Sequence, residues 1–110
     1  MIHVIHVRDA DFSDPRTVYI GRRHNRRGLE LPESPLANPF KVRNESHRTL
    51  ALSQFREHFM YTARRIPIVE LNRLIGLARS GDLRLACWCA PKACHGDVIK
   101  EWIESLIRGT

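Results

Sequence analysis

The 110-residue sequence has no long apolar run and only three cysteines. A transmembrane helix needs about 18 or more consecutive apolar residues, and no segment approaches that length. The first residues lack a basic stretch followed by a long apolar stretch, so we expect no signal peptide and no membrane partner. An odd number of cysteines is a poor disulfide framework and favours a reducing, cytoplasmic location; the three are Cys87, Cys89 and Cys94.

The motifs of the common nucleotide cofactors are also missing. The sequence contains neither a Walker phosphate loop nor a dinucleotide glycine fingerprint, so ATP hydrolysis and NAD chemistry have no support. A chain of this length is expected to form one domain spanning residues 1–110. Its 43% hydrophobic and 27% charged residues are typical of a globular protein and argue against wholesale disorder.

Lysine is scarce although the chain is basic, with a formal net charge of +6. Only three of the 18 basic residues are lysines, so 15 are arginines. The arginine fork fits phosphates bidentately, which favours a phosphate-bearing partner, although codon bias in a GC-rich genome explains the same composition. Four arginines lie close together in one short segment: Arg22, Arg23, Arg26 and Arg27. This segment is a candidate to bind the phosphates of a nucleotide or a nucleic acid. The alternative is that it is simply a solvated loop.

Hydrophobic periodicity predicts an α/β architecture. Short apolar or alternating runs predict strands at 2–7, 17–21 and 83–89. Apolar residues at helical spacing predict helices from about 44 to 65, from about 67 to 80 and from about 95 to 108. Residues 22–43 show little periodicity and are expected to be irregular. Strands interleaved with helices indicate a short, mainly parallel sheet flanked by helices.

The segment from Cys87 to Asp97 is the strongest candidate site, because ligands of open α/β sheets bind at the carboxyl ends of strands. A helix start lowers the pKa of a thiol, which makes Cys94 a candidate nucleophile. His95 is a candidate general acid or base, and Asp97 a group that orients His95 or a substrate. Gly96 lets a ligand group approach the backbone.

Two other interpretations of this segment stay open. Zinc is the alternative cofactor, with Cys87, Cys89, Cys94 and His95 as ligands, although their spacing is not that of a common zinc finger. In a purely structural interpretation the cysteines are small buried apolar residues, and Asp97 is an acid in the first turn of a helix. This interpretation is favoured for Cys87 and Cys89.

The run Ser34–Phe40 predicts a rigid turn with two prolines. Asn38 can bond its own backbone, and Phe40 can anchor the turn in the core. In the functional interpretation, Asn38 faces a ligand beside Gly21 and Arg22. In the structural one, the segment is only a loop.

Four segments, taken in order, resemble a known family: Y-I-G-R at 19–22, S-P-L-A-N-P-F at 34–40, C-W-C-A-P at 87–91 and C-H-G-D-V-I at 94–99. Together they are similar to the family catalogued as domain of unknown function 4326, many members of which are encoded by phages or prophages. Ala37 stands where the family usually has glycine, and the basic stretch 23–33 is not explained. The resemblance implies a small, Rossmann-like, three-layer α/β domain and work on nucleotides.

We therefore expect a protein directed at a nucleotide or a nucleic acid, with a ligand pocket at the strand ends and no cofactor. Arg22 would hold a phosphate and Asn38 a base or sugar. If the protein is an enzyme, it would be a hydrolase or transferase acting at a glycosidic or phosphate bond. The alternative is a non-catalytic module that binds nucleic acid or a host protein through the basic loop. A second copy of the chain could complete the single site.

Overall fold

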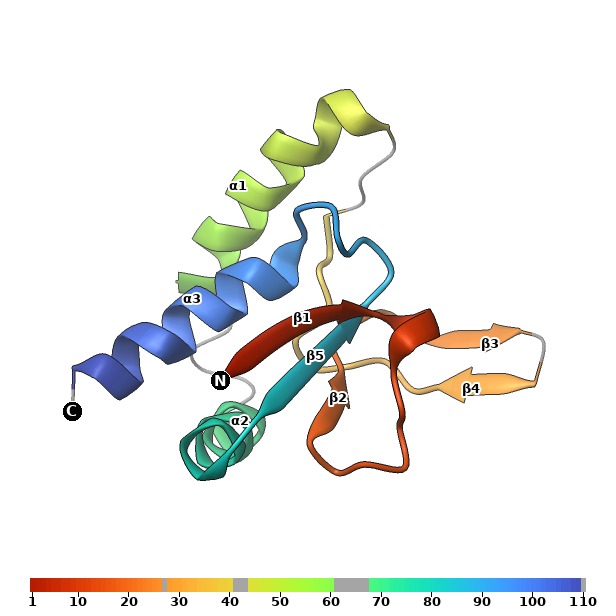
Figure 1. The fold of residues 1–110 in the computed structure, drawn as a ribbon. Helices are drawn as coiled ribbons and strands as arrows, with labels where there is room; N and C mark the ends of the chain where they lie inside the picture. Colours follow the sequence, from red (N-terminus) through yellow and green to blue (C-terminus); the bar gives the residue numbers. More distant parts are fainter. Residues whose placement is uncertain (27, 41–43, 61–67, 110) are drawn as a thin grey trace.

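The computed structural model describes residues 1–26, 28–40, 44–60 and 68–109 (Figure 1). Five strands, two short 3-10 helices and three α-helices follow one another in these ranges. In chain order they are β1 (Ile2–His6), η1 (Val7–Asp9), β2 (Thr17–Tyr19), β3 (His24–Arg26), β4 (Leu29–Leu31), η2 (Glu45–His47), α1 (Arg48–His58), α2 (Ile68–Ser80), β5 (Leu83–Cys87) and α3 (His95–Arg108).

Strands β1, β5 and β2 form a three-stranded parallel sheet with β5 in the centre. His6 pairs with Cys87, and Tyr19 pairs with Ala86. Because all three strands run in the same direction, their carboxyl ends meet at one edge of the sheet. The predicted α/β class with a parallel sheet is confirmed.

The helices pack on one face of this sheet. Helix α3 contacts β1 and β5, α1 packs on α3, and α2 contacts α3 and β5, so that α3 lies between α1 and the sheet (Figure 1). Alternate strand residues such as Leu83, Leu85 and Ile20 are fully buried in this core, together with Phe55 and Ile99.

The second face of the sheet carries a smaller cluster without an α-helix among the described residues. Val7 of η1, Leu31 of β4 and Ala86 of β5 form its buried centre. Phe12 and Tyr19 pack against it from the side. The third layer of the domain is therefore thin, and it consists of η1, the following loop and β4.

The irregular structure expected for 22–43 is wrong for part of that range. His24–Arg26 and Leu29–Leu31 form a two-stranded antiparallel sheet. Gly28 lies between them with a φ of 76°, a conformation that favours glycine. Short polar strands carry no periodic signal, so their pairing could not be seen in the sequence. The expected end of the first helix near 65 lies outside the described residues.

Helix α3 begins at the segment that the sequence singled out. Cys94 is the N-cap residue, and its Sγ accepts a hydrogen bond from the backbone N–H of Gly96 at 3.3 Å. In return, the Asp97 carboxylate accepts one from the backbone N–H of Cys94 at 2.9 Å. This reciprocal capping box fixes the start of the helix at the carboxyl end of the sheet.

Among the described residues, no helix is long and apolar enough to cross a membrane.

Candidate functional site

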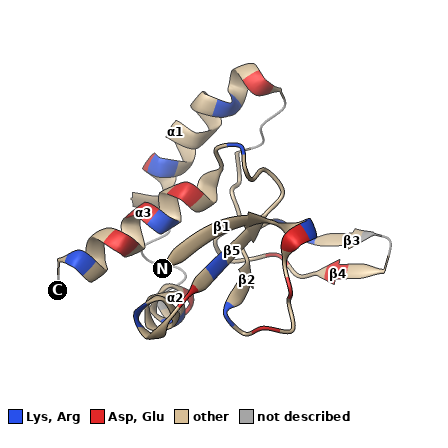
Figure 2. Cartoon of the chain, viewed as in Figure 1, with Lys and Arg blue, Asp and Glu red and all other residues tan. Residues whose placement is uncertain are grey.

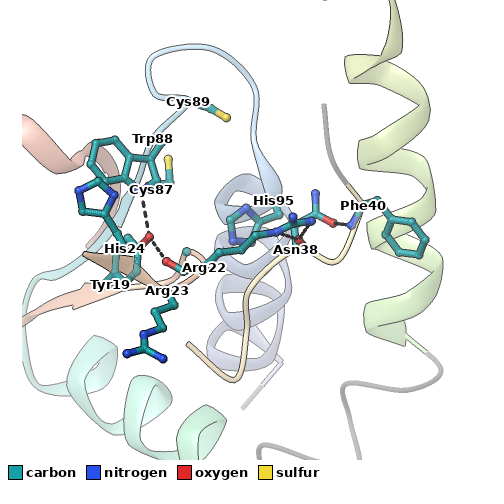
Figure 3. A pocket seen from close by; sticks show the side chains of 11 residues that line it. Tyr19, Arg22, Arg23, His24, Asn38, Phe40, Cys87, Trp88, Cys89 and His95 are labelled. Carbon is teal, nitrogen blue, oxygen red and sulfur yellow. Dashed lines mark hydrogen bonds between the residues drawn. The ribbon is translucent and has the colours of Figure 1, made fainter. Parts of the chain in front are cut away.

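A cavity of about 350 Å³ opens at the carboxyl ends of the strands (Figure 3). It lies where α/β sheets bind ligands. None of the described residues that line it is an Asp or a Glu, and two of them are arginines. The lining comprises Tyr19, Gly21, Arg22, Arg23, His24, Asn38, Phe40, Cys87, Trp88, Cys89 and His95.

One wall of the cavity is built by Arg22 and the turn that contains Asn38. The Nε and Nη2 groups of Arg22 both donate to the backbone carbonyl of Asn38, at 3.0 and 2.8 Å. The Asn38 side-chain oxygen accepts from the backbone N–H of Phe40 at 2.8 Å. The sequence prediction that Asn38 bonds its own backbone is confirmed. Arg22 thus holds the turn, and its remaining N–H donors, like the amide NH₂ of Asn38, are available at the cavity.

Gly21 allows a tight contact beneath this wall. A Cβ at position 21 would lie 2.6 Å from Cζ of Tyr19, so a larger residue would displace the Tyr19 ring. That ring is folded back so that its hydroxyl donates to the backbone carbonyl of Arg22. Glycine is therefore required here by a close approach within the protein itself.

The opposite wall is aromatic. The Trp88 indole N–H donates to the Tyr19 hydroxyl at 2.8 Å, which fixes the plane of the indole (Figure 3). The His24 ring lies 4.7 Å from the Trp88 ring, tilted by 45°. Despite these contacts, the Trp88 side chain remains 44% exposed. An exposed aromatic surface held in a fixed orientation is suited to stacking against a planar ligand.

His95 lies at the inner end of the cavity lining and is buried. Its Nε2 is 2.7 Å from the backbone carbonyl of Ile20, and since a carbonyl can only accept, Nε2 carries the proton. Burial in an apolar environment, which includes the ring of Phe55 at 5.1 Å, lowers the pKa of His95. The imidazole is therefore neutral near pH 7, with Nδ1 as a hydrogen-bond acceptor.

The cysteines are placed differently from the sequence prediction. Strand β5 ends at Cys87, so Cys89 lies beyond it and the expected strand to residue 89 is wrong. Cys87, not Cys94, lines the cavity. The Sγ atoms of Cys87 and Cys94 are 3.1 Å apart, and both side chains are buried.

The two thiols share one hydrogen bond, which separates their acidities. The two Sγ atoms are within hydrogen-bond distance, and either of them can be the donor. The contact with Cys94 and the backbone N–H groups of Ala90 and Cys89 lower the pKa of Cys87. The contact with Cys87 and burial raise the pKa of Cys94. Cys87 is therefore the more acidic thiol of the pair, whereas the sequence indicated Cys94.

Asp97 and Gly96 lie outside the cavity lining. The Asp97 carboxylate caps helix α3, as described above, whereas the hydrogen bond of the His95 ring goes to the Ile20 carbonyl. A Cβ at position 96 would lie 2.9 Å from Cδ1 of Ile20 and 3.0 Å from Cγ1 of Val4. Gly96 therefore allows α3 to pack closely on the sheet, which brings His95 to the cavity.

The basic segment is only partly described. Arg22 and Arg23 line the cavity. For Arg26 the structure describes the backbone in β3 but not the side chain, and Arg27 lies outside the described residues. Elsewhere, basic and acidic residues alternate along α3 and meet at η1 (Figure 2), and several form ion pairs, such as Arg56 with Glu101 at 3.1 Å. The cavity differs from this mixed surface in its excess of positive charge.

The zinc alternative requires several ligand side chains around one point. Within the described ranges, no group of three or more His, Cys, Asp or Glu side chains is arranged to hold a metal ion. His95 directs Nε2 at the Ile20 carbonyl, and Cys94 is engaged with Cys87 and the helix start. In this arrangement both side chains form contacts within the protein.

Four residues of the cavity lining are not among the site residues predicted from the sequence: Tyr19, His24, Phe40 and Trp88. Phe40 is predicted only as an anchor of its turn. The other three lie in or beside strands, and their types alone do not distinguish a site from a core. Trp88 offered one usable signal: it follows a strand end directly, inside the segment already singled out. Tyr19 and His24 offered none, because their roles depend on contacts with Trp88.

Residues 5–105 of the chain match a family described as a domain of unknown function, DUF4326. The chain belongs to this family. The match covers nearly the whole chain and includes every residue that lines the cavity of this DUF4326 protein. Neither the curated proteins nor the solved structures contain a significant match.

Proposed function

We propose that this DUF4326 protein binds a nucleotide in the cavity at the carboxyl ends of β1, β5 and β2. The observation that carries the proposal is the composition of the cavity, which joins an exposed aromatic wall to two arginines with no carboxylate between them. A nucleotide has the matching two parts, a planar base and an anionic phosphate. A volume of about 350 Å³ falls in the range of small-molecule sites.

The aromatic wall would receive the base. Trp88 is the largest exposed ring of the lining, and its indole is held by Tyr19 and flanked by His24. Stacking of a base on an aromatic side chain contributes about 1–3 kcal/mol. The amide NH₂ of Asn38 is a donor for a base or sugar oxygen, because the side-chain oxygen is already bound by Phe40.

The arginines would receive the phosphate. Arg22 is preorganised by its two bonds to the Asn38 carbonyl, so little conformational entropy is lost when its free N–H groups bind. Arg23 adds a second charge at the same cavity. A charge-assisted hydrogen bond contributes about 1.5–3 kcal/mol, which corresponds to roughly tenfold or more in affinity.

The test is isothermal titration calorimetry of the full chain with the four nucleoside monophosphates, the matching nucleosides and inorganic phosphate. At least one monophosphate should bind more tightly than its nucleoside and than phosphate. Arg23→Gln should weaken that binding by about tenfold. Arg108→Gln removes the same charge at the far end of α3 and should leave the affinity unchanged.

Two outcomes would contradict the proposal. One is the absence of binding by every monophosphate. The other is an equal loss of affinity in Arg23→Gln and Arg108→Gln, which would indicate attraction by net charge alone. Binding of a single-stranded oligonucleotide, with no binding of mononucleotides, would instead support the nucleic-acid alternative.

A further inference from the structure

The thiols of Cys87 and Cys94 form a buried pair, of which only Cys87 lines the cavity, and the proposed nucleotide binding does not use them. Cys87 ends β5 and Cys94 begins α3, so the pair joins the last strand to the last helix. Their Sγ atoms are 3.1 Å apart, and neither forms a disulfide. A disulfide has an S–S distance of about 2.05 Å, so the two sulfur atoms need approach by only about 1 Å.

The surroundings of the pair assign different roles to its members. Cys87 is buried but belongs to the lining of the cavity, whereas Cys94 does not line it and lies against Gly96. The Cys94 thiol and the backbone N–H groups of Cys89 and Ala90 surround the Cys87 sulfur. These donors stabilise a thiolate, which is the form of cysteine that attacks an electrophile.

We propose that Cys87 and Cys94 are a reactive dithiol that hydrogen peroxide converts to an intramolecular disulfide, with Cys87 oxidised first and Cys94 as the resolving thiol. In the first step the Cys87 thiolate attacks one peroxide oxygen, the O–O bond breaks, and a sulfenic acid and hydroxide form. In the second step Cys94 attacks the sulfur of Cys87, the S–O bond breaks, and water leaves. The dithiol loses two electrons and the peroxide gains them. A thiol reductant restores the pair.

Cys89 is the internal control for this chemistry. It lies two residues after Cys87 and also lines the cavity, but it is half-buried, and no pairing with another sulfur is found among the described residues. If only exposure governed oxidation, Cys89 would react before Cys87. If the thiol contact governs it, Cys89 should stay reduced while the other two cysteines pair.

The experiment is peptide mapping of the reduced full chain before and after treatment with hydrogen peroxide, with free thiols alkylated. Trypsin separates Leu85–Lys92, which holds Cys87 and Cys89, from Ala93–Lys100, which holds Cys94. Peroxide should join these two peptides with the loss of two hydrogen atoms, and dithiothreitol should separate them again. In Cys89→Ser the joined peptide should persist, which assigns the bond to Cys87.

A second variant identifies the order of attack. In Cys94→Ala the reaction should stop at the sulfenic acid of Cys87, which dimedone traps as an adduct on Leu85–Lys92. If this variant does not fold, the maps of the wild type and of Cys89→Ser decide alone. The proposal is overturned if peroxide leaves Cys87 and Cys94 open to alkylation, or if the joined peptide disappears in Cys89→Ser. Neither measurement depends on a bound nucleotide, so the outcome for the thiol pair is independent of the proposed nucleotide binding.

Discussion

Replacement of Gly96 by alanine tests whether the start of α3 is set by packing. A Cβ at this position would lie 2.9 Å from Cδ1 of Ile20, 3.0 Å from Cγ1 of Val4 and 3.2 Å from Sγ of Cys94. Carbon atoms in favourable contact are about 3.5–4.0 Å apart, so all three neighbours would have to move. Ile20 is fully buried in the core, so its side chain can shift only by displacing packed neighbours.

The magnitude follows from two opposing effects. Overpacking of a core costs about 1–3 kcal/mol, whereas alanine in place of glycine stabilises a helix by up to about 1 kcal/mol. The expected net effect of Gly96→Ala is therefore a loss of about 1–2 kcal/mol in the free energy of unfolding. For a chain of this size, that loss corresponds to a decrease in Tm of roughly 4–8 °C per kcal/mol.

Gly76→Ala is the matched control. Gly76 is an exposed residue within α2, and a Cβ there would meet no atom within 4 Å. This variant should gain about 0.5–1 kcal/mol from helix propensity alone. Urea and thermal unfolding followed by circular dichroism measure both changes. If Gly96→Ala is as stable as the wild type, the close packing of α3 on the sheet is refuted.

Three further variants probe the residues around the cavity. Asp97→Ala should destabilise the protein by about 0.5–2 kcal/mol in urea unfolding, because it removes the carboxylate that accepts from the backbone N–H of Cys94 at the start of α3, and an unchanged midpoint would exclude that role. The lowered pKa of His95 means that the unfolded chain binds a proton more readily than the folded one. Stability should therefore be full above about pH 6.5 and decrease as the pH falls below it, and this dependence should be weaker in His95→Gln. Tyr19→Phe removes the hydroxyl that accepts from Trp88, so we expect a loss of about 1 kcal/mol and a changed indole N–H resonance.

The parts of the fold that the sequence predicted are those with a local signal. Leu83 and Leu85 alternate with polar neighbours, and Cys94 to Asp97 have the composition of a helix start, so β5 and α3 were placed within a few residues. The strands at 24–26 and 29–31 were missed. Their pairing is stabilised by contacts such as that of Leu31 with Ala86, which are distant in sequence.

The site was predicted in position but not in detail. Arg22 and Asn38 both line the cavity, and the Arg22 side chain joins them by hydrogen bonds to the Asn38 carbonyl. The roles of the cysteines could not be deduced, since they depend on which sulfur faces the cavity. The sequence favours Cys87 as a small buried apolar residue; it is buried, and it also belongs to the lining of the cavity.

Nucleotide binding in the cavity is tested most directly by titrating the ¹⁵N-labelled full chain with nucleoside monophosphates. The signals to follow are the indole N–H resonances in the NMR spectrum. The chain has two tryptophans. Trp88 lines the cavity, whereas Trp102 packs on Phe59 at 5.5 Å in the helical layer and serves as an internal reference. If a base stacks on Trp88, the Trp88 resonance should shift saturably while the Trp102 resonance stays unchanged. A titration in which neither resonance moves, or in which only Trp102 moves, would contradict nucleotide binding in the cavity.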